Sequence, residues 1–143
     1  LTYDIWKSLG LKEVSPRQLS PLVLAYIGDS IFDLVVKTMI VTKGNTQVNK
    51  MNRVASSIVK AESQSKMIGY LEDKLTEEEE SVYKRGRNAK SYTSAKNASI
   101  SDYRRATGFE ALMGYLYMSG RYERMCELIK AALDYLESER NSK

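Results

Sequence analysis

Two acidic residues occur in parts of the sequence where a charge is energetically costly. Asp29 lies in the middle of the apolar stretch 22–41, and Glu110 is the only acid in the apolar stretch TGFEALMGYLYM. A buried carboxylate must be protonated, paired with a cation or bound to a metal, because leaving it unpaired costs several kcal/mol. Mg²⁺ takes hard oxygen ligands, often one or two carboxylates, and keeps bound waters for hydrolytic chemistry. A Mg²⁺ site held by Asp29 and Glu110 is therefore one interpretation of the pattern.

The same pattern is compatible with simpler interpretations. Each acid could instead pair with a Lys or Arg, or lie on a solvated stripe of its helix. Asp33 follows Asp29 by one turn and precedes Lys37 by four residues, so we expect an ordinary ion pair between Asp33 and Lys37. Gly28 is also unusual at this position, since a glycine inside a helix costs about 1 kcal/mol relative to Ala. A helix accepts this cost where a second backbone, a ligand or a metal comes close.

The composition excludes several kinds of active site. The chain contains no His, which removes the imidazole base, the Ser–His and Cys–His pairs and every His-ligated metal site. Its single cysteine, Cys126, cannot form an internal disulfide and lies in an apolar pattern, so we expect a buried core thiol rather than a nucleophile. The apolar stretch 22–41 is interrupted by three charged residues, so no membrane span is expected.

Basic residues are concentrated in one segment of the chain. The segment 84–105 has a net charge of +6, whereas the rest of the chain has −2. A basic patch on a nearly neutral body is typical of a surface that binds a polyanion, although a solvated charged face would show the same composition. The basic residues of this segment are Lys84, Arg85, Arg87, Lys90, Lys96, Arg104 and Arg105.

The elements that must position these residues are all predicted to be helices. The spacing of apolar residues is helical throughout, which predicts an all-α fold with about five main helices. Ser20 and Pro21 are a cap and a first helical residue, and Thr76 and Glu79 form a capping-box pattern. The five helices are expected at about 20–43, 45–71, 76–88, 101–118 and 122–136.

The segments outside these helices are predicted to be loops and ends. The segment 86–99 is small, polar and basic, which predicts an exposed loop. The residues after 136 are expected to fray, and a short helix is expected before Ser15. Because no repeat or long linker divides the chain, residues 1–143 are expected to form a single domain with its core at about 20–136.

Three segments that carry these features resemble a known family. AYIGDSIFD (25–33) resembles the signature helix of ribonuclease III nuclease domains, and TGFEALMGYLY (107–117) resembles their second acidic helix. EEEESVYKRGRNAKS (77–91) is similar to the Mini-ribonuclease III branch, a bacterial form without a separate double-stranded-RNA-binding domain. The resemblance covers about 20–136, nearly the whole chain.

The resemblance implies a function and assigns roles to the two acids. It implies a homodimeric, Mg²⁺-dependent endoribonuclease of the bacterial cytoplasm that cleaves double-stranded RNA and matures the ends of the 23S ribosomal RNA precursor. Asp29 would be the signature catalytic aspartate and Glu110 the catalytic, metal-binding glutamate. The basic segment would contact RNA through phosphates and 2′-hydroxyls. We expect these contacts from Lys84, Arg85, Arg87, Asn88, Lys90, Ser91, Lys96, Asn97, Arg104 and Arg105.

The chain also departs from the larger ribonuclease III enzymes. Those enzymes carry acids at the positions of Ala25 and Thr107 and a further acid near Gln47, so the ligand set implied here is thinner. A non-catalytic RNA-binding or ribosome-assembly factor with the same fold is therefore the main alternative. A helical protein-interaction domain and a DNA-directed nuclease are two others.

Overall fold

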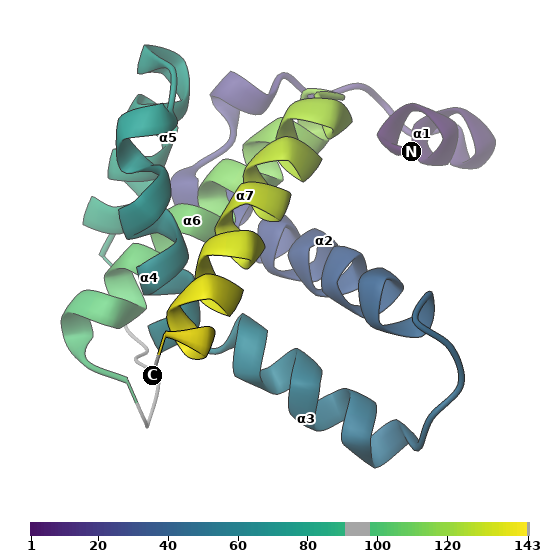
Figure 1. The fold of residues 1–143 in the computed structure, drawn as a ribbon. Helices are drawn as coiled ribbons and strands as arrows, with labels where there is room; N and C mark the ends of the chain where they lie inside the picture. Colours follow the sequence, from purple (N-terminus) through teal and green to yellow (C-terminus); the bar gives the residue numbers. More distant parts are fainter. Residues whose placement is uncertain (91–97, 143) are drawn as a thin grey trace.

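The chain folds into helices only, as shown in Figure 1 by a computed structural model that describes residues 1–90 and 98–142. Over these residues no β-strand occurs, which confirms the predicted all-α class. The helices are more numerous than the five main helices and the short N-terminal helix expected, because one predicted helix is divided and two short 3-10 helices are present. In order they are α1 (Thr2–Leu9), η1 (Pro16–Gln18), α2 (Pro21–Val41), α3 (Val48–Val59), α4 (Ala61–Leu71), η2 (Glu72–Lys74), α5 (Glu77–Asn88), α6 (Ile100–Met118) and α7 (Tyr122–Asn141).

Helix α6 is the centre of the fold and packs against α2, α4 and α5 (Figure 1). Every residue from Ala106 to Tyr117 except Glu110 is buried. The fully buried rings of Phe32 on α2 and Phe109 on α6 meet edge to face, with their centroids 5.1 Å apart. An apolar helix that is buried on almost every side explains why a single acid within it stands out.

Helices α2 and α6 cross at a point where each helix has a glycine, Gly28 on α2 and Gly114 on α6. A Cβ atom at Gly28 would collide with the backbone carbonyl of Glu110, and one at Gly114 would collide with the carbonyl of Leu24. Of the three reasons considered for Gly28, a second backbone, a ligand or a metal, the structure shows the second backbone. The crossing also determines the position of the site, because Asp29 follows Gly28 and Glu110 contributes the carbonyl that Gly28 faces.

The prediction of one continuous helix over 45–71 is wrong, because the chain bends at Lys60. Lys60 has an extended backbone, with φ −64° and ψ 153°, and separates α3 from α4. The Ser63 hydroxyl donates to the Ser57 carbonyl at 2.6 Å, and Gln64 Nε2 donates to the Val59 carbonyl at 2.7 Å. Side chains in the first turn of α4 thus satisfy carbonyls at the end of α3 that the helix itself leaves open.

The capping box predicted at the start of α5 is confirmed. Thr76 Oγ1 accepts the Glu79 amide at 3.2 Å, and Glu79 Oε1 accepts the Thr76 amide at 2.9 Å. The buried Glu79 carboxylate also accepts Nε and Nη2 of Arg124, each at 2.8 Å, which joins α5 to α7. Helix α5 ends at Asn88, as the predicted helix 76–88 does, so the predicted loop 86–99 begins after its first three residues, and its part 91–97 lies outside the described residues.

Helix α7 differs from expectation at two places. It runs to Asn141 instead of fraying after 136, because its last turns are held against α4. Tyr135 stacks on Tyr70 with the ring centroids 4.5 Å apart, and Glu139 forms an ion pair with Lys66 at 3.2 Å. Cys126 is exposed and is not the buried thiol that we expected, since its neighbour Met125 occupies the inward position.

Three further features complete the fold. The short helix expected before Ser15 is present as α1, which lies to one side of the other helices (Figure 1). Gly44 follows α2 with φ +113°, as expected for a residue that ends a helix. Within the described residues, no helix combines the length and the apolarity that crossing a membrane requires.

Candidate active site

The structure brings together the two acids that the sequence pattern indicates. Asp29 from α2 and Glu110 from α6 lie beside the glycine crossing, and their carboxyl groups are close enough to share a hydrogen bond. Glu110 is partly buried between the helices, whereas Asp29 is exposed at the surface. One carboxyl group is therefore held inside the fold while its neighbour is open to a substrate.

The pKa of Glu110 is raised from 4.5 to about 8, chiefly by burial and in addition by the hydrogen bond and the negative charge of Asp29. The amide of Gln64 partly opposes this by donating to the carboxylate. Two carboxyl groups this close cannot both ionise cheaply, so one retains a proton near neutral pH. A divalent cation can replace the proton that such a pair retains, because metal binding favours the deprotonated carboxylates.

Gln64 is a member of this site that our sequence interpretation missed. Its side chain is only 2% exposed, and Nε2 lies 2.7 Å from the Val59 carbonyl and 3.4 Å from Glu110 Oε2. Its carbonyl oxygen, Oε1, is buried without a hydrogen-bond partner. No sequence signal marks it, because Ser63, Gln64 and Ser65 are three consecutive polar residues and only the structure shows that all three are buried.

The donor set at this crossing fits Mg²⁺. It consists of two carboxyl groups that share a proton, with a buried amide beside them whose oxygen has no partner. All are hard oxygen donors, and Mg²⁺ commonly uses one or two carboxylates with water in its other positions. Across residues 1–90 and 98–142, no cluster of three or more His, Cys, Asp or Glu side chains could hold a metal. The protein ligands would therefore be few and the water ligands many.

The ion pairs show which of the acids has an ordinary salt-bridge role. Asp33 pairs with Lys37 at 2.9 Å, as expected. Neither Asp29 nor Glu110 forms an ion pair with a Lys or Arg in the described part of the chain. The two positions where the larger ribonuclease III enzymes carry acids are uncharged here. Ala25 is buried, and the Thr107 hydroxyl donates to the Tyr103 carbonyl at 3.0 Å.

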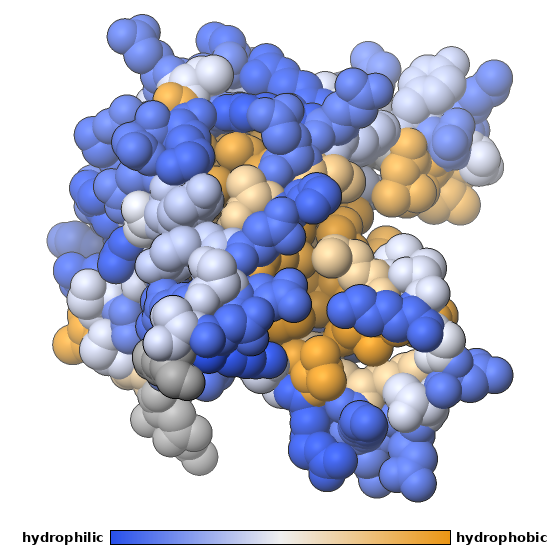
Figure 2. Space-filling model, in the orientation of Figure 1, coloured by the Kyte–Doolittle hydropathy of each residue, from blue (hydrophilic) through white to orange (hydrophobic). Residues whose placement is uncertain are grey.

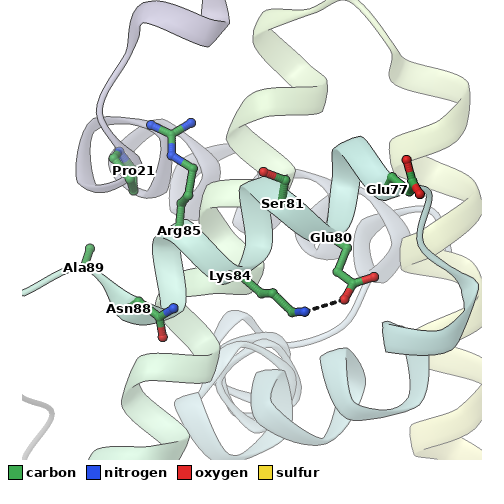
Figure 3. Close-up of a pocket in the computed structure, with 8 residues that line it drawn as sticks. All are labelled: Pro21, Glu77, Glu80, Ser81, Lys84, Arg85, Asn88 and Ala89. Atoms are coloured by element: carbon green, nitrogen blue, oxygen red, sulfur yellow. Dashed lines mark ion pairs between the residues drawn. The ribbon is translucent and has the colours of Figure 1, made fainter.

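The basic residues predicted to contact RNA are not all free to do so. Figure 3 shows Lys84, Arg85 and Asn88 along one exposed face of α5, lining an open groove of about 850 Å³ that Pro21 of α2 completes. Two acids, Glu77 and Glu80, line the same groove, and Glu80 pairs with Lys84 at 2.6 Å.

Other members of the predicted set differ in their surroundings. Arg87 lies over the Tyr83 ring, 5.7 Å from its centroid, and Arg105 is 3.8 Å from Glu72. Both side chains therefore have contacts within the fold. Lys90 and Arg104 are exposed, while Ser91, Lys96 and Asn97 lie outside the described residues.

The raised pKa of Glu110 predicts how the metal-free protein responds to pH. Since this pKa is about 8 in the folded state and 4.5 in the unfolded chain, the folded state binds more protons between these values. The corresponding stability is fully present below about pH 4.5 and is lost as the pH rises through about 8. We expect urea unfolding in EDTA to show a free energy that falls over this range, and Glu110→Gln to remove the fall. An equal fall in Glu110→Gln would show that another group is responsible.

Comparisons with known proteins identify the family to which this fold and sequence are similar. The sequence model of the Ribonuclease III domain family matches residues 22–121. Mini-ribonuclease 3 of Clostridium tetani is 50% identical over 127 residues, which cover 87% of this chain and 84% of that protein. Mini-ribonuclease 3 of Brevibacillus brevis is 46% identical over 124 residues, covering 87% and 92%. A crystal structure of a protein from Fusobacterium nucleatum superposes with a TM-score of 0.77 at 26% identity, covering 86% of this chain and 98% of that one.

Proposed function

Because the chain belongs to the ribonuclease III family of endoribonucleases, we propose that it cleaves double-stranded RNA with Mg²⁺ held by Asp29 and Glu110. The observation that carries this proposal is the pair itself. Two carboxyl groups from different helices meet beside a glycine crossing, without a Lys or Arg partner in the described residues and with the pKa of Glu110 raised to about 8. Such a pair destabilises the metal-free fold above the pKa of Glu110, and a bound cation that replaces the proton would remove this penalty.

Each residue of the site has a separate task in the proposed reaction. When bound, Mg²⁺ would supply an activated water and neutralise charge that develops on the phosphate. Glu110, held by the Gln64 amide at 3.4 Å, would be the inner ligand and would lose its proton on binding. Asp29 is exposed, so it would face the substrate and orient the attacking water. The absence of His leaves no imidazole to act in place of these carboxylates.

A comparison of substrates tests the proposed activity. The protein should cut an RNA duplex in Mg²⁺ and should not cut it in EDTA, because the carboxylate pair alone lacks a nucleophile. Single-stranded RNA and a DNA duplex of the same sequence are the matched controls, since duplex RNA is recognised by its shape and its 2′-hydroxyls. Equal cleavage of the DNA duplex would contradict the assignment. RNA binding without any cleavage would instead favour a non-catalytic RNA-binding or ribosome-assembly factor.

The exposed face of α5 is proposed to contribute to RNA binding, and the ion pair within it gives a sharp test. The Glu80 carboxylate forms an ion pair with the Lys84 ammonium at 2.6 Å, so it neutralises part of the positive charge of the groove (Figure 3). Glu80→Gln keeps the shape of the side chain and releases Lys84. We expect tighter binding of duplex RNA in fluorescence anisotropy and a log–log salt dependence steeper by up to about one unit. Weaker or unchanged binding would remove Lys84 from the RNA surface.

The homodimer implied by the family is proposed to form through α2. Apolar side chains that are exposed on this helix lie along one stripe, with Leu22 39%, Tyr26 80% and Leu34 52% exposed. Figure 2 shows apolar atoms gathered over α2 and on the side of α1 that faces it. Helix α6, the other candidate, buries its apolar side chains from Ala106 to Tyr117 inside the monomer. We expect light scattering to give about twice the 16.2 kDa mass of the chain, and a single-chain mass would contradict a stable dimer.

The finer parts of the proposal concern organisation and biological context. The buried side chains of α2 to α7 form one hydrophobic cluster, which supports a single nuclease domain over residues 1–143. We propose that the substrate is the 23S ribosomal RNA precursor and that the enzyme acts in the bacterial cytoplasm. The bacterial origin of relatives named Mini-ribonuclease 3 supports this setting. Sequencing of ribosomal RNA ends in cells that lack the protein is the direct test of the substrate.

A further inference from the structure

Helix α1 has no packing partner within its own chain. It spans only eight residues, Thr2–Leu9, and forms no extensive contact with any other helix that the structure describes. An isolated helix shorter than about 12 residues is marginal in water, because most helical stability comes from the packing of an apolar face. A surface outside its own chain is therefore needed to keep α1 folded.

The side chains of α1 divide into an apolar side and a polar side. Ile5, Trp6 and Leu9 lie within about 100° of one another around the helix, and Asp4 and Lys7 lie on the opposite side. Ile5 is 39% and Leu9 is 68% exposed, so the apolar side is open. An amphipathic helix whose apolar side is uncovered presents a surface for an apolar partner.

The exposed apolar side chains of the molecule are concentrated in two places. Of the 15 large apolar side chains that are exposed among the described residues, six lie in residues 1–14 and six on α2. Figure 2 shows a hollow between α1 and α2, with apolar atoms on both sides of it. The apolar side of α1 therefore borders the same space as α2, the helix to which the homodimer interface is assigned above.

The charge of this part of the chain indicates the kind of partner. Residues 1–41 contain four acidic and four basic residues and are neutral, whereas residues 42–143 carry the whole net charge of +4. A neutral apolar surface does not attract RNA or an anionic membrane, since both bind through uncompensated positive charge. Two copies of the chain can meet through this surface without the repulsion that the basic remainder would cause.

Residues 1–15 form an arm whose base is anchored to the body of the protein. Leu19 packs against the core, and Arg17 in η1 forms an ion pair with Glu78 of α5 at 3.2 Å. The six residues from 10 to 15 contain no helix or strand, and six extended residues span up to about 20 Å. The axes of packed helices are only about 10 Å apart. Helix α1 can therefore reach a helix that packs beside its own α2.

From these observations we propose that the arms are exchanged in the homodimer, with the apolar side of α1 packed against the exposed apolar stripe of α2 on the second copy of the chain. The inference rests on the homodimer of the proposed function and adds a contact to each half of it. Because a two-fold axis relates the copies, both arms bind in the same way. The arms add apolar area to an interface that needs roughly 800 Å² on each partner to be stable.

Trp6 reports the surroundings of the arm directly, because it is the only tryptophan of the chain. Its fluorescence spectrum is recorded over a dilution series, together with sedimentation velocity to give the fraction of dimer. We expect the emission to move to longer wavelength over the same concentrations at which the dimer dissociates, since Trp6 then becomes exposed to water. A spectrum that stays constant while the dimer dissociates would overturn the proposal, because α1 would then not lie on the second copy.

Two charge-neutral double variants distinguish the two sides of α1. Ile5→Gln with Leu9→Gln removes apolar side chains and keeps residues that favour a helix. Asp4→Gln with Lys7→Gln changes the opposite side and is the control, and all four side chains are exposed, so the core is unchanged. Because a dimer has two arms, we expect the first variant to raise the Kd of dimerisation about a hundredfold or more and the control to stay within about threefold of wild type.

A mixing experiment shows on which copy the arm lies. Ser30 is exposed on α2 between Tyr26 and Leu34. Ser30→Cys is made in a chain that also carries Trp6→Phe and Cys126→Ser, and its thiol receives a nitroxide label. Since the labelled chain has no tryptophan, the label can quench only Trp6 of the other copy. We expect quenching once labelled and wild-type chains have exchanged subunits, and mixed dimers without quenching would overturn the proposal.

The outcomes separate this inference from the function on which it rests. If the wild type is a dimer and the variant of Ile5 and Leu9 dimerises equally well, only the arm is overturned and the α2 interface stands. If the wild type is a monomer at every concentration, the homodimer and the arm both fail, whereas RNA cleavage is decided by its own assay. Equal weakening of the dimer by the variant and its control would also overturn the arm, because the apolar side would then have no special part.

Discussion

Replacing Asp29 by Asn is expected to lower the rate of duplex RNA cleavage about a thousandfold while leaving folding and RNA binding close to wild type. The substitution removes one of the two carboxyl groups that meet at the crossing of α2 and α6. Losing several kcal/mol of metal-dependent charge stabilisation corresponds to a loss of about this size in kcat. The side chain is exposed, so neither the core nor the crossing changes. Single-turnover cleavage and fluorescence anisotropy, measured on the same duplex, give the two quantities.

Asp33→Asn is the matched control for this experiment. Asp33 lies on the same helix one turn further on, and its carboxylate is paired with Lys37 at 2.9 Å. An exposed ion pair of this kind contributes less than about 1 kcal/mol, so we expect cleavage near the wild-type rate. If Asp29→Asn were fully active, or if Asp33→Asn were equally inactive, Asp29 would lose its assignment as the catalytic aspartate.

The Gly28→Ala variant is expected to be destabilised by about 3 kcal/mol or more, the upper range for adding a group to a packed core. The added methyl group would occupy the position of the Glu110 carbonyl, and backbone on a fully buried helix cannot move aside. Relief would require α2 and α6 to separate, which would also pull Asp29 away from Glu110. The midpoint and slope of urea unfolding give the free energy, and Mn²⁺ binding to the folded fraction reports the site.

Gly69→Ala is the appropriate comparison, because it is the same substitution in another helix. At Gly69 a Cβ atom would meet only the end of the Arg105 side chain, which can rotate away. Helix propensity favours Ala there by up to about 1 kcal/mol, so we expect a neutral or slightly stabilising change. If Gly28→Ala unfolded at the same urea midpoint as the wild-type protein, the helices α2 and α6 would not cross as closely as the structure places them.

The features that could be predicted from the sequence are those with a local cause. The Ser20 cap, the Thr76–Glu79 capping box and the glycine that ends α2 depend on a few neighbouring residues, and the structure contains them all. The lone acids in 22–41 and 107–118 could be recognised for a similar reason. An apolar helical pattern predicts burial, so a single charge within it requires an explanation that does not depend on knowing the partner helix.

The features that could not be predicted depend on contacts between distant segments. The break at Lys60 keeps the helical period on both sides, and only the hydrogen bonds of Ser63 and Gln64 reveal it. Whether Met125 or Cys126 faces inward is decided by how α7 lies on the core, because both fit the apolar pattern. The role of Gln64 beside Glu110 likewise follows from tertiary packing and from no motif.

The measurement that tests the central claim most directly is a count of bound Mn²⁺ by electron paramagnetic resonance. It compares the wild-type protein with Asp29→Asn and Glu110→Gln. The measurement requires no knowledge of the natural RNA. If Asp29 and Glu110 hold the ion together, both variants lose the same site, and wild-type binding strengthens as the pH rises toward the pKa of Glu110 near 8. Wild-type Mn²⁺ binding that persists in both variants would contradict the claim that this carboxylate pair is the metal centre.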